Sequence, residues 1–217
     1  MAYKAVLLDV YGTLVRDDDP WARDAVALVA GLARTGPDVV AREWEARIWA
    51  MADIAHGRDF RTLAELDAGS LAETAAHFGV RADVPARSGH LPPLFDDALP
   101  FLAAVQVPVC LVSDADTDSL AAVLDHHGIA VQHVVTSEDA RAYKPRPEPF
   151  RMALQRLGVG AADVIHIGDS PAADVAGAAA LGIDTAFVRR GGRRLPPHLT
   201  ATHTVATLTA LLPLLTR

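Results

Sequence analysis

Residues 7–14 read Leu-Leu-Asp-Val-Tyr-Gly-Thr-Leu, and they continue a short apolar run that begins at Ala5. A continuous apolar run of this length is typical of a strand buried on both faces of a parallel sheet. The run ends in a carboxylate followed by a glycine turn, which places Asp9 at the carboxyl edge of the sheet beside backbone N–H groups that can hold an anion. Taken alone, the stretch is equally compatible with an aspartate that only caps a structural turn.

Four further runs continue the strand pattern, at residues 107–112, 131–135, 164–167 and 185–188. Helical stretches lie between the later runs, at residues 119–127, 147–157 and 172–181. This alternation of strand and helix predicts an α/β fold with a Rossmann-like, open parallel sheet. In such a sheet the chemistry lies at the carboxyl ends of the strands.

The segment between the first two strands has a different character. Residues 21–32, 39–55 and 63–78, with a weaker stretch near 83–89, are rich in alanine and leucine with interleaved charges, which is typical of helices. We interpret this block as a mostly helical cap domain over residues 16–93, inserted into a core domain formed by residues 1–15 and 94–217. Its tryptophans Trp44 and Trp49 are expected to anchor the core of the block, or in one case to line a substrate pocket.

Composition limits the class of protein. The chain has 217 residues, of which 51% are hydrophobic and 22% charged, and this excludes wholesale disorder. A formal net charge of −7 argues against general nucleic-acid binding, which needs a basic face. The single cysteine, Cys110, cannot form an intramolecular disulfide, and neither a secretory signal nor a membrane-spanning apolar run is visible. We therefore expect a cytoplasmic protein without nucleic-acid or membrane partners.

Three later clusters place reactive side chains near strand ends. Ser113 and Asp114 follow the run at 107–112, and Asp169 follows the run at 164–167, with Asp174 five residues further on. Lys144 lies in a Tyr-Lys-Pro-Arg-Pro stretch just before a predicted helix. Because the carboxyl ends of parallel strands share one edge of the sheet, these side chains are candidates for one site.

In this order and on these strand ends, the four clusters resemble the nucleophile, Ser/Thr, lysine and acidic motifs of the haloacid dehalogenase-like superfamily. The resemblance covers about residues 4–182, and the helical insertion is similar to the cap that the family places after its first motif. It implies that Asp9 attacks the substrate and forms a covalent intermediate, which water later hydrolyses. Ser113 and Lys144 would hold the transferring group and offset its charge. Further substrate-binding residues would be Gly12, Thr13 and Asp114.

The resemblance also implies a metal ion. Asp9, the backbone carbonyl of Tyr11 and Asp169 would bind Mg²⁺ through hard oxygen ligands. Asp174 would lie next to the ion, in its outer coordination sphere.

Tyr11 points towards a different reaction from the later motifs. Most phosphatases of the superfamily carry at this position, two residues after the nucleophile, an aspartate that protonates the leaving oxygen, whereas Asp-x-Tyr-Gly-Thr resembles the 2-haloacid dehalogenases. Arg42 lies roughly where those dehalogenases place an arginine that grips the substrate carboxylate, although a solvated helix face explains it equally well. A phenol, with an ordinary pKa near 10, donates a proton less readily at neutral pH than a tuned carboxylic acid does.

The later motifs favour a phosphatase. Dehalogenases carry Ser-Ser-Asn where this chain has residues 169–171 as Asp-Ser-Pro, Asn-Gly where it has Asp114 and Ala115, and tyrosine where it has Phe150. Those neutral polar groups suit attack on a carbon atom without a metal.

Charge leads to the same preference. Asp9, Asp169 and Asp174 would converge with only Lys144 to oppose them, and like charges about 4 Å apart repel by ~1–4 kcal/mol. A divalent cation removes this repulsion, and phosphoryl transfer needs one at this position.

We therefore expect a Mg²⁺-dependent phosphatase that hydrolyses a small phosphorylated metabolite through an aspartyl-phosphate. The alternatives are a 2-haloacid dehalogenase that acts through an aspartyl ester, and a non-catalytic binding member of the superfamily. Tyr11 would act as a slow proton donor, or the leaving group would need little protonation, as in an acyl phosphate. Phosphonate cleavage is disfavoured, because it uses a cap lysine and residues 15–94 contain none.

Two charged runs and one histidine lie outside this scheme. Residues 189–194 hold four arginines, which form either a solvated loop or a rim that recruits anions. Residues 17–19 are three aspartates, which we interpret as a loop before a helix start and not as a metal site. His166 is expected to be a strand residue in the core.

Overall fold

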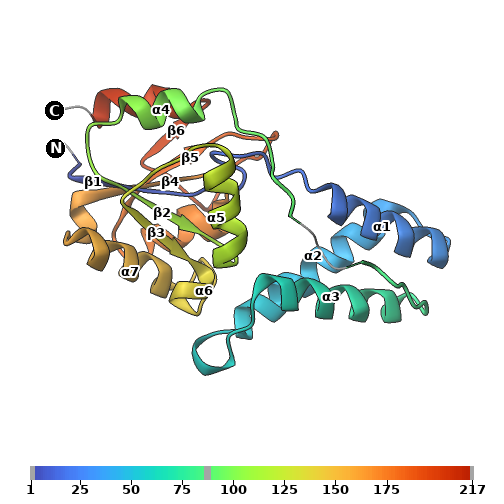
Figure 1. Cartoon of the computed structure of the whole chain (residues 1–217). Coiled ribbons are helices and arrows are strands. Elements are labelled where there is room, and N and C mark those ends of the chain that lie inside the picture. The colour runs from blue at the N-terminus through green and yellow to red at the C-terminus, as the bar shows by residue number, and fades with distance from the viewer. Residues whose placement is uncertain (1–2, 86–88, 216–217) are drawn as a thin grey trace.

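A six-stranded parallel sheet forms the centre of the computed structural model, which describes residues 3–85 and 89–215 (Figure 1). The spatial order of the strands is β3-β2-β1-β4-β5-β6. The strands are β1 (Ala5–Leu8), β2 (Val109–Ser113), β3 (His133–Thr136), β4 (Val164–Gly168), β5 (Asp184–Val188) and β6 (His203–Val205). The predicted α/β class and parallel sheet are confirmed.

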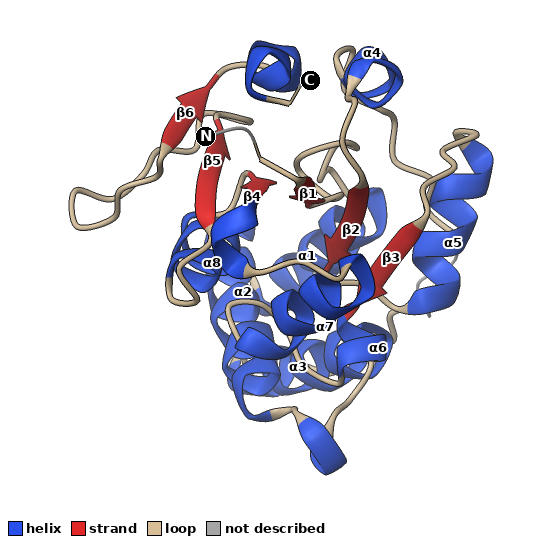
Figure 2. Ribbon diagram, turned by 90° about the vertical axis from the view of Figure 1, so that its left-hand side faces the viewer, coloured by secondary structure: helices blue, strands red, loops and turns tan. Residues whose placement is uncertain are grey.

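Helices cover both faces of the sheet (Figure 2). Val6 and Leu8 of β1 point to one face, where α4 (Ala98–Ala104), α5 (Thr117–His126) and the 3-10 helix Leu208–Leu214 pack. Leu7 points to the other face, where α7 (Pro147–Leu157) and the short α8 (Gly177–Ala179) pack; α6 (Ser137–Ala140) precedes α7. The central strands are therefore buried on both sides, which explains their continuous apolar sequences.

Local signals set the ends of α7. Pro147 stands in its first turn, where a missing N–H costs nothing, and Gly158 ends it in the left-handed conformation with φ of 67°.

The predicted helix at 172–181 was wrong in part, because Pro171–Ala176 form a π-helical turn before α8. β6 was not predicted, since its three residues are too short to show a strand pattern.

The helices α1 (Pro20–Ala33), α2 (Pro37–Ile54) and α3 (Leu63–His77) confirm the three main helices predicted between the first two strands. They form a helical block, together with their connecting loops, beside the sheet on the side towards which β1 runs (Figure 1). Trp44 is buried within the block and donates to Ser70 Oγ at 2.8 Å. Trp49 is 47% exposed, so its expected role in the core was wrong.

The weak helix predicted at 83–89 was also wrong for the residues that can be judged. Residues 83–85 and 89 are not helical, and residues 86–88 lie outside the described part of the chain. Trp21 Nε1 donates to the carbonyl of Pro85 at 2.7 Å, a bond that ties this connection to α1. Within the described residues, no helix combines the length and apolar character needed to span a bilayer.

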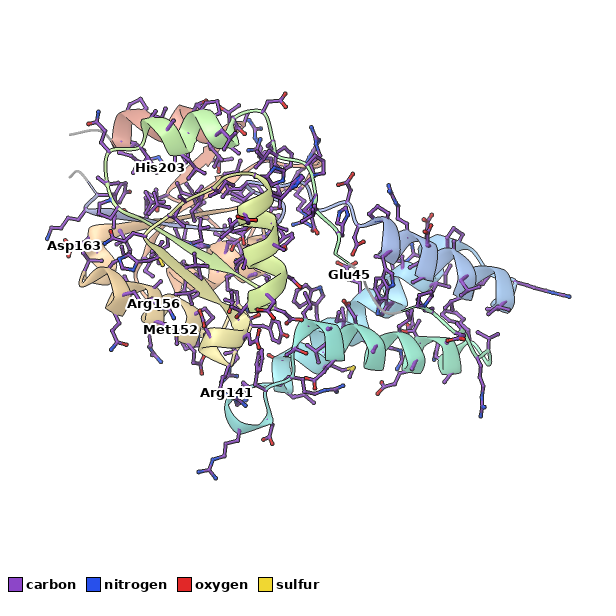
Figure 3. All side chains as sticks on the ribbon, in the orientation of Figure 1. Glu45, Arg141, Met152, Arg156, Asp163 and His203 are labelled. Atoms are coloured by element: carbon purple, nitrogen blue, oxygen red, sulfur yellow. The ribbon has the colours of Figure 1, made fainter. Side chains whose placement is uncertain are left out.

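Several polar contacts join the helical block to the sheet side of the molecule. The carboxylate of Asp116 accepts the backbone N–H groups of Leu63 at 2.6 Å and Ala64 at 3.0 Å, at the start of α3. Tyr143 is buried among residues of the block and donates to the carbonyl of Arg61 at 2.8 Å. Arg141 follows α6, and its Nε donates to the carbonyl of Gly57, in the loop between α2 and α3, at 2.6 Å (Figure 3). The division of the chain at residues 15 and 94 stays a prediction.

Candidate active site

Three carboxylates meet at the carboxyl edge of the sheet. Asp9 follows β1 and Asp169 follows β4, the neighbouring strand, while Asp174 lies in the π-helical turn after β4. Oxygen atoms of these three side chains lie within 4.8 Å of one another, and all three side chains are buried. Ser113 ends β2 on the other side of β1, and its Oγ is buried with no hydrogen-bond partner among the described residues.

The turn after β1 is shaped so that Asp169 can approach it. The N–H groups of Thr13, Leu14 and Val15 all donate to the carbonyl of Val10, at 3.2, 2.8 and 3.0 Å. Gly12 has a φ of 84°, and a Cβ at this position would lie 2.6 Å from Asp169 Oδ1. Glycine is therefore required at residue 12 both by the backbone conformation and by the neighbouring carboxylate.

Lys144 connects two of the carboxylates. Its Nζ donates to Asp9 Oδ1 and to Asp174 Oδ1, each at 2.7 Å, and its side chain is buried. Burial disfavours the charged ammonium, but the charges of Asp174 and Asp9 more than compensate and raise the pKa of Lys144. The backbone N–H of Lys144 donates to Asp114 Oδ1 at 2.9 Å, so Asp114 holds the main chain of the lysine.

The carboxylates differ in how readily they ionise. Burial raises the pKa of Asp9, and Lys144 only partly offsets this. Burial, followed by the charge of Asp9, raises the pKa of Asp169 to about 7. For Asp174, burial is outweighed by the charge of Lys144 and the hydrogen bond from His166, and its pKa lies well below the usual range. Without a further cation, Asp9 and Asp169 therefore resist carrying charge together.

Arg193 supplies a positive charge that the sequence analysis missed. Its Nη1 donates to Asp169 Oδ2 at 2.6 Å, and its Nη2 lies 3.3 Å from Asp17 Oδ2. The expectation that only Lys144 opposes the three carboxylates was therefore wrong. The contact arises because the loop that carries Arg193 follows β5, the strand next to β4. That strand order is the only signal from which the pair could have been anticipated.

The charged runs are thus more than a solvated surface. Arg190 donates to Asp97 Oδ1 at 2.6 Å and to the carbonyl of Thr13 at 3.2 Å, and its guanidinium lies 4.0 Å from the centre of the Phe95 ring. A hollow of about 320 Å³ lies between this arginine loop and the turn after β1, and both Gly12 and Asp169 line it. Residue 19 starts a helix as predicted, because Asp19 Oδ1 accepts the N–H of Trp21 at the beginning of α1.

The remaining candidates occupy different environments. Thr13 is buried in the turn, and Tyr11 is half-buried in the same turn. Burial raises the pKa of Asp114 to about 7. Arg42 is exposed on α2 and makes no ion pair or hydrogen bond with any residue in the described ranges, the three carboxylates included. His166 is buried in β4 as expected, and its Nε2 also lies 2.9 Å from Asp174 Oδ1.

The site fits a divalent cation. Its donors are carboxylate oxygens, which Mg²⁺ prefers in proteins. Asp9 Oδ2 is buried and has no hydrogen-bond partner among the described residues, so one oxygen in the middle of the cluster is available to a cation. Asp169 would become fully available once Arg193 moves away, which its 44% exposed side chain allows.

Comparison with known proteins establishes the family. Residues 3–182 match the haloacid dehalogenase-like hydrolases. The phosphoglycolate phosphatase of Rhodospirillum rubrum is 30% identical over 209 residues, which cover 89% of this chain and 82% of that protein. The chain therefore belongs to the haloacid dehalogenase-like hydrolases.

Other matches are partial in sequence or concern the fold. The haloacid dehalogenase-like hydrolase domain-containing protein 3 of Danio rerio is 50% identical over 50 residues, and the match spans 23% of this chain and about a fifth (21%) of that relative. The structure of L-2-haloacid dehalogenase from Xanthobacter autotrophicus superposes with a TM-score of 0.76 at 20% identity, covering 98% of both chains. At this identity the likeness is one of fold, and both phosphatases and dehalogenases are among the similar proteins.

Proposed function

We propose that this hydrolase is a Mg²⁺-dependent phosphatase that cleaves a small phosphorylated metabolite, with residues 16–93 acting as a cap domain over the site. The observation that carries the proposal is the buried cluster of Asp9, Asp169 and Asp174, in which Asp9 Oδ2 lacks a described partner. Three carboxylates in such proximity are stabilised by a divalent cation, which phosphoryl transfer also requires. The relative from Rhodospirillum rubrum, a phosphoglycolate phosphatase, supports the same reaction class.

The reaction would proceed in two displacements at phosphorus, the first by Asp9 and the second by water. In the first, an oxygen of Asp9 forms a bond to phosphorus while the bond between phosphorus and the leaving oxygen breaks. In the second, water attacks the phosphorus, the bond to Asp9 breaks, and inorganic phosphate leaves. Lys144 lies 2.7 Å from Asp9 Oδ1, where its charge favours the ionised nucleophile and offsets charge on the phosphoryl group. Ser113 Oγ, which has no hydrogen-bond partner in the described part of the chain, can donate to a phosphoryl oxygen.

Asp9, the carbonyl of Tyr11 and Asp169 would hold the cation. When bound, Mg²⁺ supplies charge neutralisation and alignment of the phosphoryl group. The leaving oxygen takes its proton from Tyr11, or needs none when the leaving group is a carboxylate or a phosphate, as in an acyl phosphate or an anhydride. Gly12, Thr13 and Asp114 would form the floor of the substrate site.

A 2-haloacid dehalogenase is the second candidate, and one contact favours it. Arg193 with Lys144 brings two positive charges to the three carboxylates, so the cluster is closer to neutrality without a metal than the sequence indicates. In that reaction Asp9 would attack the carbon that carries the halogen, and halide would leave as an aspartyl ester forms. Arg42 is exposed on α2 and pairs with no described residue, so the structure gives this candidate no support from a substrate-binding arginine.

A substrate panel separates the candidates. Sugar phosphates, nucleotides, acyl phosphates, phosphoglycolate and 2-haloacids are each incubated with Mg²⁺ and, separately, with excess chelator. We expect phosphate release that chelation abolishes. Halide release from a 2-haloacid in excess chelator would contradict the proposal, and silence on every substrate with Mg²⁺ bound would favour the non-catalytic alternative.

Three variants link the activity to the cluster. Asp9→Asn should abolish turnover and leave the fold intact, as judged by circular dichroism. Asp169→Ser should weaken Mg²⁺ binding and turnover together, because it removes a hard oxygen ligand. Asp118→Asn, on the exposed surface of α5, removes the same charge away from the site and is the matched control. An Asp9→Asn variant that retains more than a few percent of activity would disprove the nucleophile.

A further inference from the structure

The carboxylate of Asp174 is held by three donors. Lys144 Nζ donates to Oδ1 at 2.7 Å, the backbone N–H of Ser170 donates to Oδ2 at 2.9 Å, and His166 Nε2 lies 2.9 Å from Oδ1. The side chain is buried and packs against the end of β4, where a Cβ on Gly168 would lie 2.3 Å from Asp174 Cγ. Asp174 therefore has little space to rotate, and its orientation depends on these donors.

His166 presents one nitrogen to this carboxylate. Asp174 accepts hydrogen bonds from Lys144 Nζ and from the backbone N–H of Ser170, as an ionised carboxylate does, so the hydrogen of the third contact is placed on His166 Nε2. Nδ1 is buried and has no partner among the described residues, and a hydrogen there would be a buried donor without an acceptor. The Phe150 ring packs against the imidazole at right angles, with the ring centres 5.0 Å apart, and limits its rotation. The geometry therefore favours the tautomer with hydrogen on Nε2.

A chain of hydrogen bonds links this histidine to the nucleophile. His166 contacts Asp174, Asp174 accepts from Lys144, and Lys144 donates to Asp9 Oδ1 at 2.7 Å. Because the ammonium of Lys144 is shared between two carboxylates, its position over Asp9 depends on where Asp174 stands. A donor that orients Asp174 therefore also orients Lys144, in the way that outer residues orient the ligands of a metal site.

We propose that His166 is a positioning residue, which holds Lys144 against Asp9 through the carboxylate of Asp174. The inference rests on the role of Asp9 as the nucleophile in the proposed function. It does not depend on whether Asp9 attacks phosphorus or carbon, since both reactions use the same lysine and the same aspartate. The side-chain contacts of His166 are with Asp174 and Phe150, so it would act on Asp9 only through Asp174 and Lys144.

The test compares two substitutions of His166. His166→Leu removes the donor, whereas His166→Gln places an amide N–H near the position of Nε2. We expect kcat to fall about 10- to 100-fold in the leucine variant, the range seen when residues behind a metal ligand are replaced, with a much smaller change in KM. The glutamine variant should recover to within a few-fold of the original kcat. Thr185→Val, a buried polar position opposite His166 on β5, is the matched control and should keep the original kcat.

A second measurement needs no substrate and is independent of how the variants fold. Long-range ¹H–¹⁵N correlation spectra of the unmodified protein should show the His166 tautomer with hydrogen on Nε2. An unmodified kcat in His166→Leu, a glutamine variant as slow as the leucine variant, or hydrogen on Nδ1 alone would each overturn the inference. These results leave the phosphatase proposal untouched. Conversely, halide release in chelator would refute the phosphatase, and the His166 variants would then be compared by their rates of halide release.

Discussion

Replacing Arg193 by glutamine tests whether this arginine and Mg²⁺ compete for Asp169. Arg193 Nη1 lies 2.6 Å from Asp169 Oδ2, an oxygen that the proposed metal site needs. A bound cation would therefore break this ion pair. The Arg193→Gln variant has no pair to break, so we expect it to bind Mg²⁺ more tightly than the unmodified protein.

The magnitude follows from the exposure of the pair. Asp169 is buried, but the Arg193 side chain is 44% exposed, so water and salt screen much of the attraction. Exposed ion pairs of this kind contribute ~0.5–1 kcal/mol, and this corresponds to a Mg²⁺ dissociation constant lower by about 2- to 5-fold in the variant. The difference should shrink as ionic strength rises.

Isothermal titration calorimetry with Mg²⁺ at fixed ionic strength measures the dissociation constant of each variant. Arg194→Gln is the matched control: it removes the same charge from the neighbouring residue, which makes no ion pair with a described carboxylate, and should leave the affinity nearly unchanged. An affinity in Arg193→Gln equal to that of the control would refute competition at Asp169. A weaker affinity would show instead that Arg193 helps to build the metal site.

Three further substitutions test features of the structure by urea unfolding. Gly12→Ala should lower the free energy of unfolding by about 1–2 kcal/mol because of its φ of 84°. The loss should be larger still, because the added methyl group would lie 2.6 Å from the Asp169 carboxylate. Gly182→Ala, with φ of 73° and open space around it, should show the backbone cost alone. Asp114 has a folded pKa raised by burial from 3.8 to about 7, so the folded protein retains a proton that the unfolded chain releases, and stability falls as pH rises through this window. Asp114→Asn cannot ionise and should gain at least about 1.4 kcal/mol over the unmodified protein between pH 4 and pH 8, whereas a pH-independent difference would contradict the assignment. Asp116→Ala should cost about 1 kcal/mol by leaving the first N–H groups of α3 without their acceptor. The exposed Asp118→Ala should cost less, because it removes only an acidic side chain from the first turn of α5.

Features with a local cause could be predicted from the sequence. The limits of α7 follow from Pro147 and Gly158, because each residue acts on its own backbone torsions. The central strands were predicted because burial on both faces requires a continuous apolar run. The meeting of Asp9 and Asp169 needed only one additional rule, that parallel strands place their carboxyl ends at the same edge of a sheet.

Tertiary structure decided the features that depend on which distant segments become neighbours. Arg193 reaches Asp169 because β5 lies beside β4, and the sequence contains no local sign of that order. From the sequence, His166 is predicted only as a core residue. In the fold, the turn after β4 places Asp174 Oδ1 2.9 Å from His166 Nε2. The sequence predicted the carboxylates and the lysine of the candidate site through strand pattern and motif. Their charge balance and orientation were decided by packing, because a side-chain contact depends on positions in space that residues far apart in the chain acquire only when the sheet is assembled.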